Sequence, residues 1–260
     1  MKIVKALGFI VPTLFSSLVL VSAALATPPP VYDYVVKERR AIDRDNFTQG
    51  LMIWDDKLWV SSGLYGESFI ARYEWPSLTN RQITKLADRY FAEGLAELDG
   101  RLYLLTWRSR ELLVMDPDSM TIVDTLALQG EGWGVASDGG QLWISDGTHR
   151  LSVWENNEVK RTIEVTYEGK RISQLNELEW VSGEIWANVW LTDQIVRIDP
   201  TSGIITGIID LRGLLPRNER RRNTDVLNGI AVDPKTGAIW LGGKRWPTLF
   251  RIELTERNPH

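Results

Sequence analysis

The sequence repeats one short unit five times, and this repetition constrains the fold more than any other feature. Each unit holds an apolar residue followed by Trp or Tyr, and turn residues such as Asp, Gly and Ser precede the pair. The aromatic members lie 40 to 54 residues apart. Repeats of about forty residues with several short strands each are typical of β-propeller blades. The pairs are Leu58-Trp59, Leu102-Tyr103, Leu142-Trp143, Ile185-Trp186 and Ile239-Trp240.

The two ends of the chain suggest how such a ring closes. Later strands are visible in most units, for example "ELLVMDP" followed by "TIVDTLAL", but the last unit ends at "TLFRIEL" without a fourth strand. A spare β-rich segment, "VYDYVVKE", spans residues 31–38. Pairing it with the last unit removes an exposed sheet edge, whereas an open stack of sheets leaves edges unpaired. The sequence therefore predicts an all-β fold, a five-bladed β-propeller closed by an N-terminal strand.

The N-terminal segment is typical of an export signal. Lys2 and Lys5 precede an apolar run, and Ala24-Leu25-Ala26 supplies a small-x-small cleavage pattern. We expect a signal peptide over residues 1–26 and a catalytic propeller domain over residues 27–260; an uncleaved membrane anchor is the alternative. The mature chain is expected to be exported, periplasmic or secreted, with no stable membrane association after signal removal.

Composition narrows the chemistry. The chain has 12 Trp, only 2 His and no Cys, so disulfides and thiolate chemistry are excluded and a His-rich zinc site is disfavoured. The net charge of -4 argues against a nucleic-acid partner, and the basic run "RNERRR" at 217–222 is expected to be a solvated loop. His149 is expected in an exposed turn without a Ser or Asp partner, which argues against a hydrolase triad. We expect a monomer without a cofactor.

Equivalent positions of the five units form a first ring. They lie ten residues before the aromatic residue, or twelve in the fifth unit, whose turn is longer. The first strand of a propeller blade lines the central channel, so these side chains are expected to meet at one mouth. Glycine follows four of the five, which fits a close approach of the innermost strands. The ring consists of Gln49, Glu93, Trp133, Asn176 and Asn228.

A second ring lies four residues after each aromatic residue. Neighbouring strands run antiparallel, so a residue early on the first strand and one late on the second share the same end of the blade. Both rings should therefore face one rim and bring a carboxylate, an ammonium group, amides and tryptophans together. The second ring consists of Gly63, Trp107, Gly147, Trp190 and Lys244.

Each of these residues also has a purely structural interpretation. The alternative for the tryptophans is packing in the core, for Gln49 a hydrogen bond to a loop, and for Asn176 and Asn228 a cap on the backbone at a strand start. Glu93 in a narrow aromatic pocket should have a raised pKa, because burial disfavours its charged form, although Lys244 acts in the opposite direction. A structural Glu93–Lys244 ion pair is the alternative. Glu177 is expected just above the first ring.

At these same residues the chain resembles the plant-type, or bacterial, glutaminyl-peptide cyclotransferases. The strings "FTQGL", "FAEGL", "LTW", "GEGWG", "SDGT", "LNELEW", "DVLNGIA" and "GKRWP" appear in the family order over residues 46–250. The resemblance implies a metal-independent enzyme that converts the N-terminal glutamine of peptides or proteins to pyroglutamate with release of ammonia. It also implies nine active-site residues: Phe47, Gln49, Phe91, Glu93, Trp107, Trp133, Asn176, Trp190 and Lys244.

The expected mechanism follows from the reaction. Glu93 is assigned as the general acid and base that moves the proton from the attacking amine to the leaving nitrogen. Lys244, with Asn176 or Gln49, is expected to stabilise the oxyanion. Two other functions stay open: an exported propeller that binds peptides or proteins without catalysis, and a calcium-dependent propeller lactonase. Glu93, Asn176 and Asn228 are suitable calcium ligands, but Lys244 at the same mouth would repel the cation.

Overall fold

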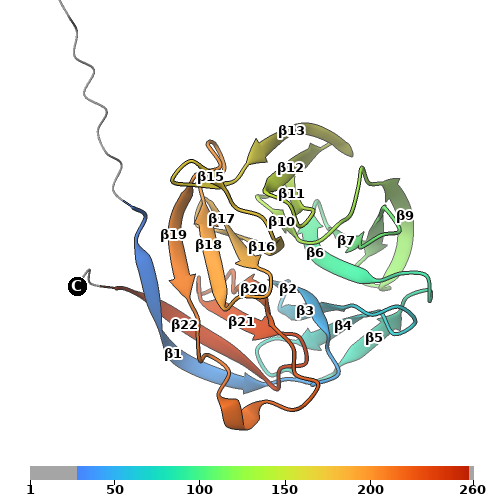
Figure 1. Cartoon of the computed structure of the whole chain (residues 1–260). Coiled ribbons are helices and arrows are strands. Elements are labelled where there is room, and N and C mark those ends of the chain that lie inside the picture. Colours follow the sequence, from blue (N-terminus) through green and yellow to red (C-terminus); the bar gives the residue numbers. More distant parts are fainter. Residues whose placement is uncertain (1–27, 258–260) are drawn as a thin grey trace, which may run out of the picture.

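The computed structural model describes residues 28–257, which form an all-β, propeller-like fold (Figure 1). Three separate four-stranded antiparallel sheets follow one another along the chain, each with its strands in sequence order. Their strands are β2 (Thr48–Trp54), β3 (Lys57–Ser62), β4 (Phe69–Glu74) and β5 (Gln82–Lys85); β6 (Ala92–Leu98), β7 (Arg101–Thr106), β8 (Glu111–Asp116) and β9 (Thr121–Ala127); and β10 (Val135–Ser137), β11 (Leu142–Ser145), β12 (Arg150–Glu155) and β13 (Glu158–Glu164).

The remaining long strands form one eight-stranded sheet. Its order, β16-β17-β18-β19-β1-β22-β21-β20, shows two antiparallel sets of four strands joined side by side. Its strands are β16 (Leu175–Val181), β17 (Glu184–Val189), β18 (Gln194–Ile198), β19 (Ile205–Asp210), β1 (Val31–Ala41), β22 (Thr248–Glu256), β21 (Ile239–Gly243) and β20 (Leu227–Val232). The short elements are the hairpin β14 (Thr166–Tyr167) and β15 (Lys170–Arg171) and a 3₁₀-helix, Arg217–Glu219.

Tight turns explain why the strands pair with their sequence neighbours. Asp99 and Gly100, which join β6 to β7, both have positive φ angles of 52° and 72°. Two successive left-handed residues are characteristic of a type I′ turn, whose twist matches that of a hairpin. Asn156 and Asn157 make the equivalent turn between β12 and β13, with φ angles of 52° and 62°.

The N-terminal strand closes the fold, as predicted. β1 pairs antiparallel with β22 from Tyr32 opposite Glu256 to Ala41 opposite Thr248, so the first and last strands of the described chain share one ladder. Its first residues also pair parallel with β19, where Val31 lies opposite Ile208. β1 therefore covers the edges of two neighbouring strand sets at once (Figure 1).

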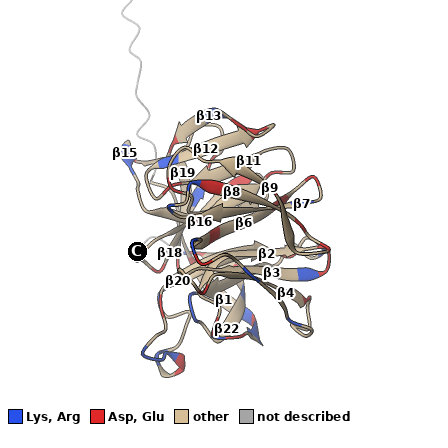
Figure 2. Cartoon of the chain, turned by 90° about the vertical axis from the view of Figure 1, so that its right-hand side faces the viewer, with Lys and Arg blue, Asp and Glu red and all other residues tan. Residues whose placement is uncertain are grey.

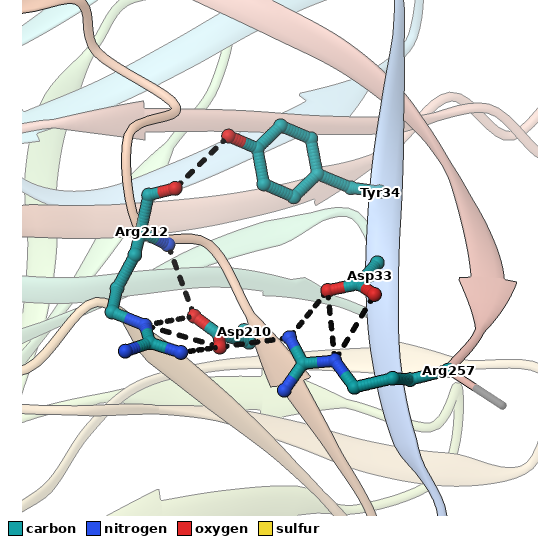
Figure 3. A network of polar contacts seen from close by, with 5 residues as sticks. All are labelled: Asp33, Tyr34, Asp210, Arg212 and Arg257. Atoms are coloured by element: carbon teal, nitrogen blue, oxygen red, sulfur yellow. Dashed lines mark hydrogen bonds and ion pairs between the residues drawn. The ribbon is translucent and has the colours of Figure 1, made fainter. Parts of the chain in front are cut away.

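An ion-pair cluster holds this junction, and we call it the clasp (Figure 3). Arg257, just after β22, donates to both carboxylate oxygens of Asp33 on β1 and, at 2.9 Å, to Oδ2 of Asp210 at the end of β19. Arg212 donates from Nε to the same Asp210 at 2.8 Å, and the Tyr34 hydroxyl donates to the Arg212 carbonyl at 3.3 Å. The clasp thus ties the N-terminal strand, the C-terminal strand and β19 together.

The core lies between adjacent sheets. Met52 and Trp59 of the first sheet pack with Leu95 and Leu104 of the second. Of the five repeated aromatic residues, Trp59, Trp143, Trp186 and Trp240 are buried, as expected of core anchors, whereas Tyr103 is only partly buried.

Charged residues gather instead at strand ends and on connecting loops (Figure 2). The predicted basic loop is one of these: Arg217, Arg220, Arg221 and Arg222 are all exposed. The predicted signal peptide, residues 1–26, lies outside the described residues. No helix within residues 28–257 has the length and apolarity needed to cross a membrane.

Candidate active site

All nine residues that the resemblance implies line a single cavity of about 330 Å³. This is a size that accommodates a small ligand. Glu93, Gln49, Asn176 and Lys244 are buried, whereas the aromatic residues among the nine are partly exposed and form the walls. Three further residues line the cavity that the repeat pattern did not indicate: Leu64, Leu191 and Asp225.

The polar residues of the first ring sit on β-bulges. In β2 the pairing with β3 shifts register between Thr48 and Gly50, which leaves Gln49 as the extra residue. The same irregularity falls at Glu93-Gly94 in β6, at Asn176-Glu177 in β16 and at Asn228-Gly229 in β20. A bulge redirects a side chain locally, so the repeated position found in the sequence is a repeated backbone irregularity.

Hydrogen bonds link each unit to the next through residues at its first or second strand and form a continuous circuit. Asn228, predicted to be either a pocket residue or a backbone cap, belongs to this circuit, does not line the cavity and is therefore a cap. The circuit fixes the backbone under each pocket residue. Its bonds are Ser61 Oγ to Glu93 O, Gly94 N to Trp133 O (2.7 Å), Ser145 Oγ to Asn176 O (2.7 Å), Gly229 N to Asn188 Oδ1 (3.1 Å) and Asn228 Nδ2 to Gln49 O (3.0 Å).

The glycines that follow ring positions are required by close packing. A Cβ atom on Gly94 would lie 2.6 Å from the backbone nitrogen of Val135, and one on Gly134 would lie 2.0 Å from the carbonyl oxygen of Asn176. Both distances are too short for a side chain. The innermost strands therefore approach one another as closely as the sequence pattern indicated.

The fourth unit has Glu177 where the others have glycine, and its placement corrects the prediction that it lies above the ring. Glu177 is buried, does not line the cavity, and accepts hydrogen bonds from the backbone N–H groups of Leu51 at 3.4 Å and Ile230 at 2.9 Å. Glu179 bonds Val232 N in the same way at 3.0 Å, and burial raises its pKa to about 8. Both carboxyl groups bridge innermost strands and are structural.

The surroundings of Glu93 favour its protonated form. Burial raises its pKa well above the ordinary value; the positive charge of Lys244 opposes this shift, and the negative charge of Glu131 adds to it. Its Oε1 atom accepts one long hydrogen bond from Gln49 Nε2 at 3.4 Å. A carboxyl group with a raised pKa can exchange protons near neutral pH.

Lys244 lies in the same cavity but does not form the structural ion pair considered above. The ion pairs within residues 28–257 do not include one between Lys244 and Glu93. Burial lowers the pKa of Lys244, while the charges of Glu93 and Asp225 act in the opposite direction. Its Nζ atom stands 5.2 Å from the centroid of the Phe47 ring.

An acidic residue outside the rings orients two tryptophan walls. Glu131 Oε2 accepts the indole N–H groups of Trp107 at 2.8 Å and Trp133 at 3.0 Å. Partial burial would raise the pKa of Glu131, but these two hydrogen bonds and a third from Arg108 lower it below its usual value. Glu131 lies outside both rings and was not predicted as a site residue, although its place in "GEGWG", two residues before Trp133, was a signal. The remaining wall contacts are edge-to-face, such as Trp133 against Trp190 with centroids 5.5 Å apart.

The structure also corrects the expectation for His149. It is half-buried rather than exposed, and its Nε2 atom lies 3.4 Å from Glu164 Oε1, on which Arg171 also converges. It does not line the cavity, in keeping with its exclusion from the site.

With this geometry in view, comparisons with known proteins decide the family. The glutamine cyclotransferase family matches residues 10–254. The chain belongs to that family. This confirms the resemblance and the enzyme class, glutaminyl-peptide cyclotransferase, predicted from the sequence.

Two similar proteins support the family assignment. The glutaminyl-peptide cyclotransferase of Arabidopsis thaliana is 38% identical over 222 residues, which are 82% of this chain and 69% of that protein. The crystal structure of Myxococcus xanthus glutaminyl cyclase superposes with a TM-score of 0.79 at 31% identity and covers 88% of this chain and 100% of that one.

Proposed function

We propose that this chain converts the N-terminal glutamine of peptides or proteins to pyroglutamate and releases ammonia, with Glu93 as the acid and base. One observation carries the proposal. Glu93 and Lys244 are both buried in one aromatic-walled cavity, and no ion pair joins them. A carboxyl group and an amine held apart in this way are available to a substrate rather than to each other.

Glu93 acts at two moments of the reaction. The neutral α-amine of the substrate attacks its own γ-carboxamide carbon, and Glu93 takes the proton that the amine nitrogen loses. Glu93 then donates this proton to the carboxamide nitrogen as its bond to carbon breaks, so that ammonia leaves and the lactam ring remains. Because nucleophile and electrophile belong to one residue, holding the side chain curled supplies much of the acceleration.

Lys244, Gln49 and Asn176 supply the other polar contacts to the substrate. Lys244 donates to the oxygen that becomes negatively charged in the tetrahedral intermediate. The oxygens Gln49 Oε1 and Asn176 Oδ1 are buried and have no hydrogen-bond partner in the described chain. Unpaired buried acceptors are costly unless a ligand satisfies them. These oxygens are therefore assigned to the N–H groups of the substrate, while the amide nitrogen of Asn176 stays the second donor for the oxyanion, as expected from the sequence.

The aromatic walls favour cyclisation over hydrolysis. Phe47, Phe91, Trp107, Trp133 and Trp190 enclose the space in which the glutamine methylenes fit. Excluding water keeps it from competing with the amine for the same carbon, which would yield glutamate.

We count the architecture as five blades. The eight-stranded sheet divides at the parallel β1–β19 contact into β16–β19 and the set β20, β21, β22 and β1, each with the strand number of the three separate sheets. This count also matches the five repeated units of the sequence.

Export and a monomeric state are parts of the same proposal. The N-terminal sequence supports export, to be checked by cell fractionation and N-terminal sequencing of the mature protein. Sedimentation of the purified protein checks the monomer.

The deciding experiment incubates the mature protein with a glutaminyl dipeptide. Cyclisation is expected, seen as ammonia release and as the mass loss of one ammonia from the peptide. Unchanged peptide would favour a scaffold that only binds peptides. Activity that a chelator abolishes would favour the calcium lactonase, but Asn228, one of its three suggested ligands, does not line the cavity.

A further inference from the structure

A second hollow adjoins the candidate active site. It is a polar groove lined by Leu191, Asp193, Arg220, Thr224 and Asp225 together with Thr192 and Val226. Leu191 and Asp225 line both the groove and the cavity, so the two hollows share a boundary. Backbone hydrogen bonds also join the two linings: Asp225 N donates to Lys244 O at 3.0 Å, and Lys244 N donates to Val226 O at 2.9 Å.

The geometry of the cavity determines where the rest of a peptide must go. Glu93, Gln49 and Asn176 are buried at its inner end, so a glutamine side chain enters with its carboxamide inward. The residues that follow must leave through the mouth. Leu191 stands there as a largely exposed apolar side chain, 66% accessible, between the two hollows. A peptide that crosses Leu191 enters the groove.

Charge distinguishes which side chains suit the groove. Of the residues that line it, only Arg220 is cationic, and the ion pairs of residues 28–257 include none to Arg220. The one carboxylate of the short helix, Glu219, is taken by Arg39 of β1. Asp193 and Asp225 also line the groove, and no ion pair within residues 28–257 includes either of them, so Arg220 is the one group of the groove that attracts a carboxylate.

We propose that this groove is the subsite for the second and third residues of the peptide substrate, and that Arg220 selects an acidic side chain there. The inference rests on the proposed function, because it concerns the same substrate. Arg220 belongs to the basic loop that protrudes beside the ends of β1 and β22 (Figure 1), and the loop thereby gains a role beyond solvation. Arginine suits this role because its guanidinium group can bind a carboxylate with two parallel hydrogen bonds.

The test compares three tripeptides that start with glutamine and differ only in the second residue, which is Glu, Ala or Lys. The wild-type protein should show the highest kcat/KM for Glu and the lowest for Lys. We expect about a two- to five-fold difference at each step, the size of an exposed ion pair, and a smaller difference at high salt.

Variants separate recognition from a merely structural role of the loop. Arg220→Ala should abolish the preference for Glu, and Arg220→Glu should favour Lys more strongly, because Asp193 and Asp225 remain in the groove. Arg217→Ala is the matched control, because Arg217 is exposed on the same loop but does not line the groove.

The outcomes are distinct. Turnover of all three peptides with ratios that Arg220→Glu leaves unchanged would overturn the subsite and leave the proposed function standing. Turnover of none would overturn both.

Discussion

Two regions of this molecule bring acids and bases together, with opposite electrostatic results. In the clasp, Arg257 and Arg212 bond the carboxylates directly, and hydrogen bonds from Arg212 and Arg257 lower the pKa of Asp210 despite partial burial. In the cavity, Glu93 and Lys244 form no ion pair. Burial raises the pKa of Glu93 and lowers that of Lys244, and both shifts favour the neutral form of the side chain. The charged side chains therefore pair with one another in the clasp, whereas those of the cavity have no ion-pair partner.

The difference shows that the clasp contributes to the stability of the fold, whereas the buried charges of the cavity reduce it. A paired carboxylate at a strand junction stabilises the folded state, whereas an unpaired buried one destabilises it at neutral pH. Removing a charged group from the cavity should therefore lower activity but not stability, whereas removing one from the clasp should lower stability but not activity. Four single substitutions test this difference between the two regions.

Glu93→Gln should lower kcat by about 10²- to 10⁴-fold, because the amide cannot take up or return the proton. The melting temperature should stay the same or rise. A carboxyl group with a raised folded pKa loses stabilising free energy as pH rises above its unfolded pKa, and glutamine does not ionise. Ammonia release and thermal unfolding by circular dichroism at pH 7 provide the two measurements. Wild-type turnover in this variant would remove Glu93 from the mechanism.

Lys244→Met should lower kcat by about 10²- to 10³-fold, the cost of losing one donor to an oxyanion. It should also move the acid limb of the kcat/KM profile to higher pH, because the charge of Lys244 keeps the pKa of Glu93 from rising further. Profiles over pH 4–9 measure both effects. A limb that does not move would show that the two charges do not interact.

Asp210→Asn, in the clasp, should have the reverse profile: unchanged kcat and a loss of about 1–2 kcal/mol in the free energy of unfolding at pH 7. The folded pKa of Asp210 is lowered, so its contribution is fully present above the unfolded pKa and disappears as pH falls through the folded value. Wild type and variant should therefore converge in strongly acidic solution. Denaturant unfolding measures this, with exposed Asp118→Asn as control. A difference that persists unchanged at acidic pH would contradict the assignment.

The repeats made the cavity predictable to an unusual degree. Gln49, Glu93 and Asn176 occupy equivalent positions, and equivalence in a radially repeated fold places side chains around one axis. The repeat could also indicate the closure by β1, because the last unit lacks a strand that residues 31–38 could supply.

What the repeats missed are residues without counterparts in other units. Glu131 and Leu191 belong to connections between strands, where each unit differs. Glu177 shows another limit: the sequence places it beside the ring, but the bulge and the neighbouring N–H groups of β2 and β20 decide that it points away from the cavity. Arg257 of the clasp lies beyond any repeated position.

Glu131→Gln should have the smallest effect of the four substitutions. Glu131 shares one property with the carboxylates of the clasp and another with the charged groups of the cavity. Its carboxylate is bonded, as in the clasp, yet its charge raises the pKa of Glu93 in the cavity. Removing this charge should move the acid limb of kcat/KM to lower pH, opposite to Lys244→Met. Loosened tryptophan walls should cost only a few-fold in kcat, about the effect of one hydrogen bond. Glu155→Gln on β12, an exposed residue outside the cavity, is the control and should leave the limb in place. If Glu131→Gln moved the limb upward, Glu131 would act on Glu93 only through the positions of Trp107 and Trp133 and not through its charge.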